Sequence, residues 1–127
     1  MFIVMISVSK ALKMYARCKD EKGRRMYGYI RNAGGAPANV AISAARNGLQ
    51  AGMYCKVGND DFGKFLLETL RENHVTPLSP EMTDDATTTM AFVSLNENND
   101  RSFTFARKPG ADMLLDKREI KDEDLED

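Results

Sequence analysis

The pattern of hydrophobic and polar residues first predicts a helix within residues 34–48, GGAPANVAISAARNG. Gly34 and Gly35 free the backbone and predict a loop that enters the helix. Pro37 suits the first helical turn, the interior is rich in alanine, and Gly48 stands where a C-terminal cap is expected. The stretch that follows, LQAGMYCKV, is typical of a strand of about seven residues.

A second helix is predicted directly after this strand. Either Asn59 or Asp60 can cap its first turn. Its apolar face follows at steps of three and four residues: Phe62, Phe65, Leu66, Thr69 and Leu70. Asn73 and His74 close the helix. The order helix, strand, helix predicts a layered α/β sheet.

The pattern then changes to a period of two, which predicts a β-hairpin. TTTMAFVSL and RSFTFAR are rich in β-branched and aromatic residues, and NENND between them suits a hairpin loop. We expect this hairpin to be an addition to the sheet. KPGADMLL then turns the chain back, and the acidic end, DKREIKDEDLED, is expected to begin a further helix on the surface.

Composition describes an ordinary globular chain. With 127 residues, 43% of them hydrophobic and 29% charged, about one domain is expected, neither disordered nor fibrous. The net charge of -1 gives no general attraction to nucleic acid or anionic lipid. Basic residues interleaved with Tyr15, Tyr27 and Tyr29 offer a stacking surface for single-stranded nucleic acid. Without excess positive charge or an RNA-binding signature, we instead expect these tyrosines to pack a lid or an edge strand, and no nucleic-acid partner.

Other classes of site and location find little support in the sequence. Cys18 and Cys55 belong to no C-x-x-C pair, so a cytoplasmic setting without a disulfide framework is expected. The apolar run Phe2–Val8 is too short for a membrane span and poorly flanked for a signal peptide, so it predicts a buried strand and no membrane partner. His74 has no identifiable Ser or Cys partner, which disfavours a catalytic triad or metal site.

The nine residues VGNDDFGKF nearly match the phosphate-binding loop G-x-x-x-x-G-K-[ST]. Asp60 and Asp61 lie inside the turn, however, where they would repel phosphates, and Phe65 replaces the metal-binding hydroxyl. The preferred interpretation is an Asp-capped helix, with Gly63 allowing close packing and Lys64 in solvent. We therefore expect this stretch alone to bind no nucleotide.

GGAPANVA is the more informative motif. A Gly pair ahead of a helix presents free N–H groups and the positive end of the helix dipole to a polar ligand, and Asn39 adds a donor and an acceptor. Extended along the chain, the spacing resembles the first signature of the ribokinase-like (PfkB) carbohydrate kinases through Gly34, Gly35, Pro37, Asn39, Ala41, Gly48 and Gly58. Within that family the chain is most similar to fructokinase, through GGAPANVAISAARNG, KVGNDDFGKFLLETLREN and FARKPGADMLL. The resemblance covers about residues 34 to 127.

The resemblance implies a fold and a set of sugar-binding residues. The fold is a partial ribokinase-like (Rossmann-like) layered α/β fold with a small β-hairpin lid. The Gly-Gly loop and its Asn bind sugar hydroxyls in such kinases, which implies Gly34, Gly35 and Asn39. An aromatic residue and an Arg at the end of the lid meet the substrate in fructokinase-like members, which implies Phe105 and Arg107. Packing in the hairpin core for Phe105, and a plain surface charge for Arg107, are the structural alternatives.

The reaction that the resemblance implies is transfer of the γ-phosphate of ATP, with Mg²⁺, to a ketohexose such as fructose. In the family a Gly-Ala-Gly-Asp run supplies the anion hole and the catalytic base, and it does not occur in these 127 residues. We therefore expect no catalytic residue here, poor binding of ATP and Mg²⁺, and no turnover by this chain alone.

The N-terminus also departs from the family. The first strand of the family carries a sugar-binding Asp, whereas this chain has no acidic residue before Asp20, and a loop is expected for Asp20 and Glu21. We divide the chain into a divergent N-terminal strand and lid segment, 1–33, and a sugar-binding part, 34–127. Three hypotheses stay open: a piece of a sugar kinase, a non-catalytic module for sugar binding or for homodimerisation through the β lid, and a truncated remnant that folds poorly.

Overall fold

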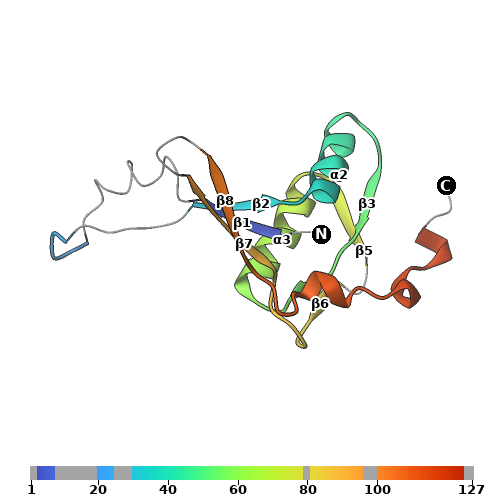
Figure 1. The fold of residues 1–127 in the computed structure, drawn as a ribbon. Coiled ribbons are helices and arrows are strands. Elements are labelled where there is room, and N and C mark those ends of the chain that lie inside the picture. Colours follow the sequence, from blue (N-terminus) through green and yellow to red (C-terminus); the bar gives the residue numbers. More distant parts are fainter. Residues whose placement is uncertain (1–2, 8–19, 25–29, 79–80, 96–99, 125–127) are drawn as a thin grey trace.

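The computed structural model of the chain describes residues 3–7, 20–24, 30–78, 81–95 and 100–124. Within these residues, three groups of strands, two helices and a series of 3-10 turns make up the fold (Figure 1). The elements, in chain order, are β1 (Ile3–Ser7), β2 (Ile30–Gly34), α2 (Ala36–Arg46), β3 (Ala51–Tyr54), β4 (Val57–Gly58), α3 (Asp61–Glu72), β5 (Val75–Leu78), β6 (Met82–Thr83), β7 (Met90–Leu95), β8 (Arg101–Ala106), η1 (Ala111–Leu114), η2 (Lys117–Glu119) and η3 (Asp122–Asp124).

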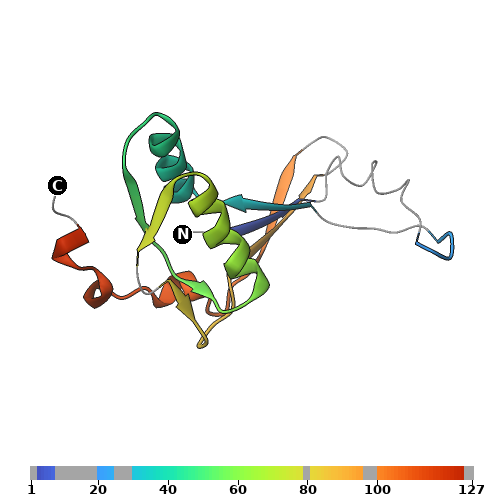
Figure 2. The same cartoon turned by 180° about the vertical axis from the view of Figure 1, so that it is seen from behind.

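A four-stranded sheet with the order β2-β1-β7-β8 extends from one side of the molecule (Figure 2). β1 runs antiparallel to β2 and parallel to β7, and β7 runs antiparallel to β8. The predicted hairpin is confirmed as β7 and β8, and the predicted N-terminal strand is confirmed as β1, between β2 and β7. The sequence did not predict β2 and placed Gly34 in a loop. The expected loop there is wrong, because Gly34 pairs with Ile3 as the last residue of β2.

Two smaller parallel sheets, β3-β5 and β4-β6, make up the other side of the molecule. The predicted single strand in LQAGMYCKV is two short strands, 51–54 and 57–58, each with its own partner. Neither β5 nor β6 was predicted. β5 contains Pro77, which cannot donate a ladder hydrogen bond and which weakens the strand pattern in the sequence.

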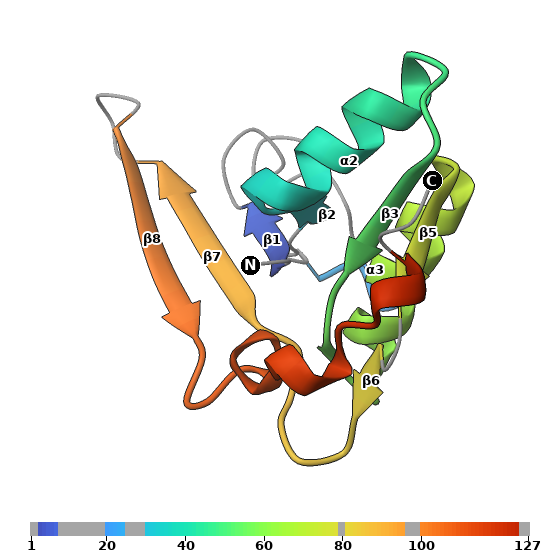
Figure 3. The ribbon, with the colours of Figure 1, turned by 90° about the vertical axis from the view of Figure 1, so that its right-hand side faces the viewer.

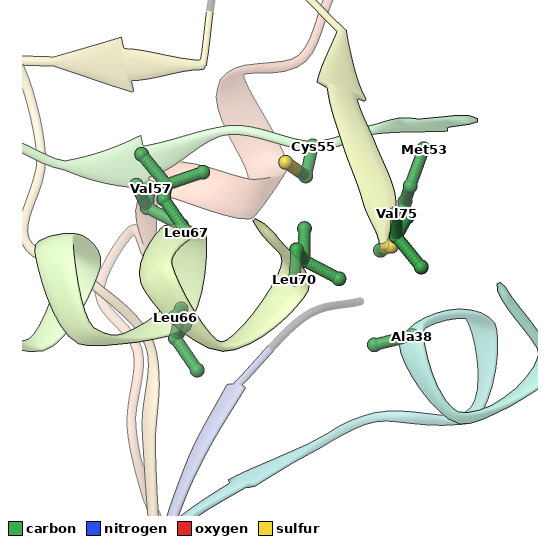
Figure 4. Packing of buried hydrophobic residues seen from close by; sticks show 8 residues of the cluster. All are labelled: Ala38, Met53, Cys55, Val57, Leu66, Leu67, Leu70 and Val75. Carbon is green, nitrogen blue, oxygen red and sulfur yellow. The ribbon is translucent and has the colours of Figure 1, made fainter. Parts of the chain in front are cut away.

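The main hydrophobic core lies between β3, β4, β5 and the two helices (Figure 4). Leu66, Leu67 and Leu70 of α3 are fully buried there and meet Val57 and Val75. Phe92 of β7 packs against the same cluster. On β2, Arg31 places its guanidinium carbon 3.9 Å from the ring centroid of Phe65 on α3. The larger sheet is therefore attached to the core through one of its two faces.

The expected C-terminal helix is wrong for the described part of the acidic end. Only the 3-10 turns η2 and η3 form there. Asp116 and Glu119 make a capping box at the N-terminus of η2, which ends after a single turn, and η3 consists of three acidic residues. Glu119 and Glu123 carry like charges four positions apart, a spacing that disfavours a continuous α-helix.

Side chains of the β3–β4 segment attach this C-terminal segment to the core, and Figure 3 shows the segment beside β3 and β5. The Tyr54 hydroxyl accepts a hydrogen bond from the Lys121 N–H at 2.8 Å and donates one to Asp124 at 2.6 Å. Lys56, which is buried, pairs with Glu119 and donates to the Leu114 carbonyl at 3.3 Å. Tertiary contacts rather than helix propensity set its path.

Candidate functional site

The N-terminus of α2 is open. Gly35 is its N-cap residue, and its φ of 114° lies in a region that residues with a side chain rarely adopt. Among the residues that the structure describes, no side chain caps the first turn, and no acidic residue lies in that turn. Asn39 donates its backbone N–H to the Gly35 carbonyl at 3.1 Å and keeps its side chain exposed. Ala36 and Pro37 are exposed, so the positive end of the helix dipole lies at the surface, with no counter-charge from its own first turn.

The N-terminus of α3, by contrast, is closed by Asp60. Its Oδ1 accepts from the Gly63 N–H at 2.7 Å and from the Thr88 hydroxyl at 2.8 Å, and its Oδ2 accepts from the Thr88 N–H at 2.9 Å. The Thr88 hydroxyl oxygen in turn accepts from the Gly58 N–H at 3.0 Å. The predicted Asp cap is thus confirmed, and a carboxylate occupies the position where a phosphate loop would hold its anion.

These contacts keep Asp60 ionised. Burial alone raises the pKa of its carboxyl, but the hydrogen bonds from the N–H groups of Thr88 and Gly63 and from the Thr88 hydroxyl outweigh it and lower the pKa below its ordinary value. Gly63 contributes by its size, because a Cβ there would lie 2.1 Å from the Gly58 carbonyl oxygen. Lys64 is exposed, as predicted.

Arg107, predicted as a substrate contact, is paired within the protein. Its Nη2 lies 2.5 Å from Oδ2 of Asp112, whose side chain is 7% exposed, while that of Arg107 is 33% exposed. The other Asp112 oxygen accepts a hydrogen bond from the buried Thr89 hydroxyl. Arg107 Nε is buried without a hydrogen-bond partner in the described part of the chain. The guanidinium therefore has an unused donor.

Phe105 lies on the face of the larger sheet that points away from the core. Phe92 packs against the core and pairs with Thr104, so the next residue, Phe105, is on the opposite face. Phe105 is 50% exposed and stacks on Phe103, with 6.3 Å between the ring centroids. Its cross-strand partner on that face, Ala91, is buried, so packing within the hairpin stays an alternative to a substrate contact for Phe105.

Strand register brings the two groups of predicted residues to one end of the sheet. Ala33, Val4, Met90 and Ala106 form a row across the four strands. Gly34 follows Ala33 at the same end where Arg107 follows Ala106. With strands about 4.8 Å apart, three strand steps separate the two backbones by roughly 14 Å. The open turn at Gly35 and the paired Arg107 are therefore at the same end of the sheet.

Other residues considered in the sequence do not join this group. Asp20 forms a local turn, accepting from the N–H of Arg24 at 2.8 Å and from its Nε at 2.6 Å. The Arg24 N–H and guanidinium lower the pKa of the Asp20 carboxyl. His74 is exposed. Residues named in the sequence analysis that fall outside the described residues are Phe2, Val8, Tyr15, Cys18, Tyr27 and Tyr29.

Two residues of the site were missed by sequence reasoning. Asp112 lies in the block FARKPGADMLL, yet nothing in its spacing showed that it pairs with Arg107, and Thr89 looked like an ordinary strand residue.

Burial raises the pKa of the Cys55 thiol to about 11, so this cysteine is no nucleophile near neutral pH.

The described residues hold no group of three or more His, Cys, Asp or Glu side chains arranged to bind a metal. Within the same ranges, no helix is long and apolar enough to cross a membrane. A hollow of about 280 Å³ beside the Asp60 turn is lined by acidic and polar residues and one alanine: Asn59, Asp60, Thr83, Asp84, Asp85, Ala86 and Thr87. These residues do not fit the phosphates of a nucleotide, because their carboxylates carry the same charge.

Comparison with known proteins gives one family across nearly the whole chain. Residues 6–127 match the model described as pfkB family carbohydrate kinase. The chain is 46% identical over 88 residues to probable fructokinase-3 of Arabidopsis thaliana, covering 69% of this chain and 26% of that protein. It is 44% identical over 92 residues to fructokinase-1 of Oryza sativa subsp. japonica, covering 72% and 28%. The chain spans about a quarter of the length of these relatives.

Solved structures agree. Fructokinase from Xylella fastidiosa matches with a TM-score of 0.77 and 32% identity, covering 97% of this chain and 36% of that chain, and it has also been solved with bound ATP. A putative ribokinase II from E. coli matches with a TM-score of 0.75 and 28% identity, covering 98% and 38%. The predicted partial ribokinase-like α/β fold and the predicted family resemblance are both confirmed.

Proposed function

The chain belongs to the pfkB family of carbohydrate kinases, and from this premise we propose that residues 34–127 are the sugar-binding part of a fructokinase-like enzyme. Residues 1–33 contribute a divergent first strand and a lid segment. The observation that carries the proposal is the strand register, which brings the open turn of Gly35 and the end of β8 to the same end of one sheet.

Each proposed substrate contact has a chemical reason. Gly34 is buried and shapes the turn, while the first turn of α2 after Gly35 and the side chain of Asn39 offer backbone and amide hydrogen bonds to the hydroxyls of a ketohexose such as fructose. Phe105 offers an exposed ring face to the sugar, and Arg107, whose side chain is 33% exposed, offers guanidinium donors. None of these groups acts as a base, so the proposed role is binding and orientation.

In the intact enzyme we propose that the sugar receives the γ-phosphate of ATP, assisted by Mg²⁺. The described residues do not fit ATP or Mg²⁺, because Asp60 fills the phosphate-like turn and no metal-binding group of side chains is found among them. We expect these 127 residues alone to bind sugar without forming sugar phosphate.

Calorimetric titration of the chain with fructose tests the proposal, with ATP-dependent sugar phosphate formation measured in parallel. Phe105→Ala should weaken fructose binding about tenfold. Phe103→Ala is the matched control, because Phe103 has the same exposure on the same face of β8 but lies farther from Arg107. Fructose binding that is absent, or weakened equally by both changes, contradicts the proposed site.

The exposed lid supports a second candidate, association of two copies through β8. β8 is the last strand in the sheet order, all its described residues are exposed, and Phe103 and Phe105 are each 50% exposed. An apolar edge strand of this kind is a surface for strand pairing. Sedimentation should show a dimer that Phe103→Ser weakens, and a monomer at every concentration contradicts it.

The proposed compartment is the cytoplasm, which fits a chain without a C-x-x-C pair and with Cys55 as a free buried thiol. A relative that is 45% identical over 87 residues is named chloroplastic. Imaging of the tagged protein in its own cells separates the two compartments.

A further inference from the structure

Asp112 forms an ion pair with Arg107, the proposed substrate contact at the end of the lid. One Asp112 oxygen lies 2.5 Å from Nη2 of Arg107, and the other accepts from the buried Thr89 hydroxyl. Both carboxylate oxygens are therefore occupied, and the side chain has little solvent to move into, since it is 7% exposed. Asp112 is fixed where it both orients Arg107 and balances its charge.

A guanidinium paired in this way selects among ligands. Its side chain is 33% exposed, so it still offers hydrogen-bond donors to a ligand. Its charge is already neutralised, however, and a phosphate brought to it would meet the Asp112 carboxylate at close range. Sugar hydroxyls need donors but no net charge, whereas a phosphate ester needs an uncompensated cation.

We propose that Asp112 is a positioning and specificity-determining residue, which makes the lid accept an uncharged sugar and reject a phosphorylated one. This inference rests on the proposed function, because it concerns the same Arg107. Asp112 acts through Arg107 and does not itself touch the substrate.

The chain contains a matched control pair. Asp116 binds the guanidinium of Arg118 at 2.7 Å, but the Arg118 side chain is 83% exposed and belongs to the C-terminal segment. Asp116→Asn therefore releases an arginine from a carboxylate without altering the lid. A general gain of positive charge affects both variants, whereas an effect of the lid pair appears only in Asp112→Asn.

The experiment titrates the full chain with fructose and with fructose 6-phosphate. The unaltered chain should prefer fructose, and Asp112→Asn should shift the ratio of the two affinities about tenfold toward the phosphate ester. Asp116→Asn should leave the ratio unchanged. Adding Arg107→Gln to Asp112→Asn should remove the gain, because the released charge is then gone. If Asp112 had a purely structural role, Asp112→Asn would weaken the binding of fructose and of fructose 6-phosphate equally.

An unchanged ratio in a folded Asp112→Asn variant overturns the inference. Inorganic phosphate is a second probe that needs no variant: in excess, it should leave fructose binding by the unaltered chain unchanged, and competition would overturn the inference. If the chain binds neither sugar, the proposed function fails separately. Direct titration with inorganic phosphate then decides, because Asp112→Asn but not Asp116→Asn should gain affinity, and equal behaviour overturns the inference.

Discussion

Two glycine-containing turns of this chain each lead into a helix, and they differ in what occupies the helix N-terminus. At α3 the carboxylate of Asp60 accepts hydrogen bonds from the N–H groups of Gly63 and Thr88. At α2 the N-cap is Gly35, and no side chain of the described residues caps the turn. The turn before α3 is filled by Asp60, whereas the turn before α2 lacks such an internal acceptor within those residues.

The comparison teaches that glycine spacing does not by itself indicate a phosphate or sugar site. VGNDDFGKF has the spacing of a phosphate loop, but its own acid fills it, and the glycines serve close packing. GGAPANVA is less specific as a short motif, yet it lacks an acid and a cap. The charge inside the turn decides whether the backbone donors remain available.

The largest expected effect is at the closed turn. Gly63→Ala would place a Cβ 2.1 Å from the Gly58 carbonyl oxygen, and backbone has to move to relieve the clash. We expect a loss of about 3 kcal/mol or more in the free energy of unfolding, measured by denaturant titration. Gly52→Ala is the control, because its Cβ would meet only the Leu78 side chain at 3.1 Å. Equal losses contradict the close-packing role.

The turn around Asp60 should also make the free energy of unfolding sensitive to acid. The lowered pKa of Asp60 means that its contribution to stability is present above the unfolded pKa of about 4 and is lost as pH falls through the folded value. Asp60→Asn should cost about 1 kcal/mol at neutral pH, since an amide cannot accept at both oxygens' positions, and should flatten the acid loss. Asp61→Asn, at an exposed carboxylate, serves as the control. Identical pH profiles for the two variants would sink this assignment.

Gly35→Ala should cost about 1–2 kcal/mol of stability, because φ is 114° there, and should also abolish fructose binding. Gly48→Ala imposes comparable backbone strain at the other end of the helix, where φ is 86°. Thermal unfolding with and without fructose separates the two. Only Gly35→Ala should lose the shift caused by the sugar, and a shift retained in Gly35→Ala argues against the open turn.

The smallest effect on stability is expected at Asn39. Its side chain is exposed, so Asn39→Ala should change the free energy of unfolding by less than about 0.5 kcal/mol. Fructose affinity should nevertheless fall about tenfold. Ser43→Ala, at an exposed position one turn further along α2, should change neither quantity. Calorimetric titration of both variants checks this, and an unchanged affinity removes Asn39 from the proposed site.

The sequence by itself determined the elements that depend on neighbouring residues. The Asp60 cap, the burial of Leu66 and Leu70 and the β7–β8 hairpin follow from patterns of residues close in the chain. Leu67 is buried as well, although it lies outside the predicted apolar face. The family, too, could be inferred from local blocks, since its motifs are short runs with fixed spacing.

Only the tertiary structure decided which distant residues meet. Pairing of β1 with both β2 and β7 brings Gly34 and Arg107 to one end of the sheet, and no local pattern specifies that register. Asp112 forms its ion pair with Arg107 only because the turn after β8 folds back toward Thr89. The acidic C-terminal segment is held by contacts with Tyr54 and Lys56 and does not form an α-helix. Contacts between distant residues depend on the packed chain, and they override local propensity where that propensity is weak.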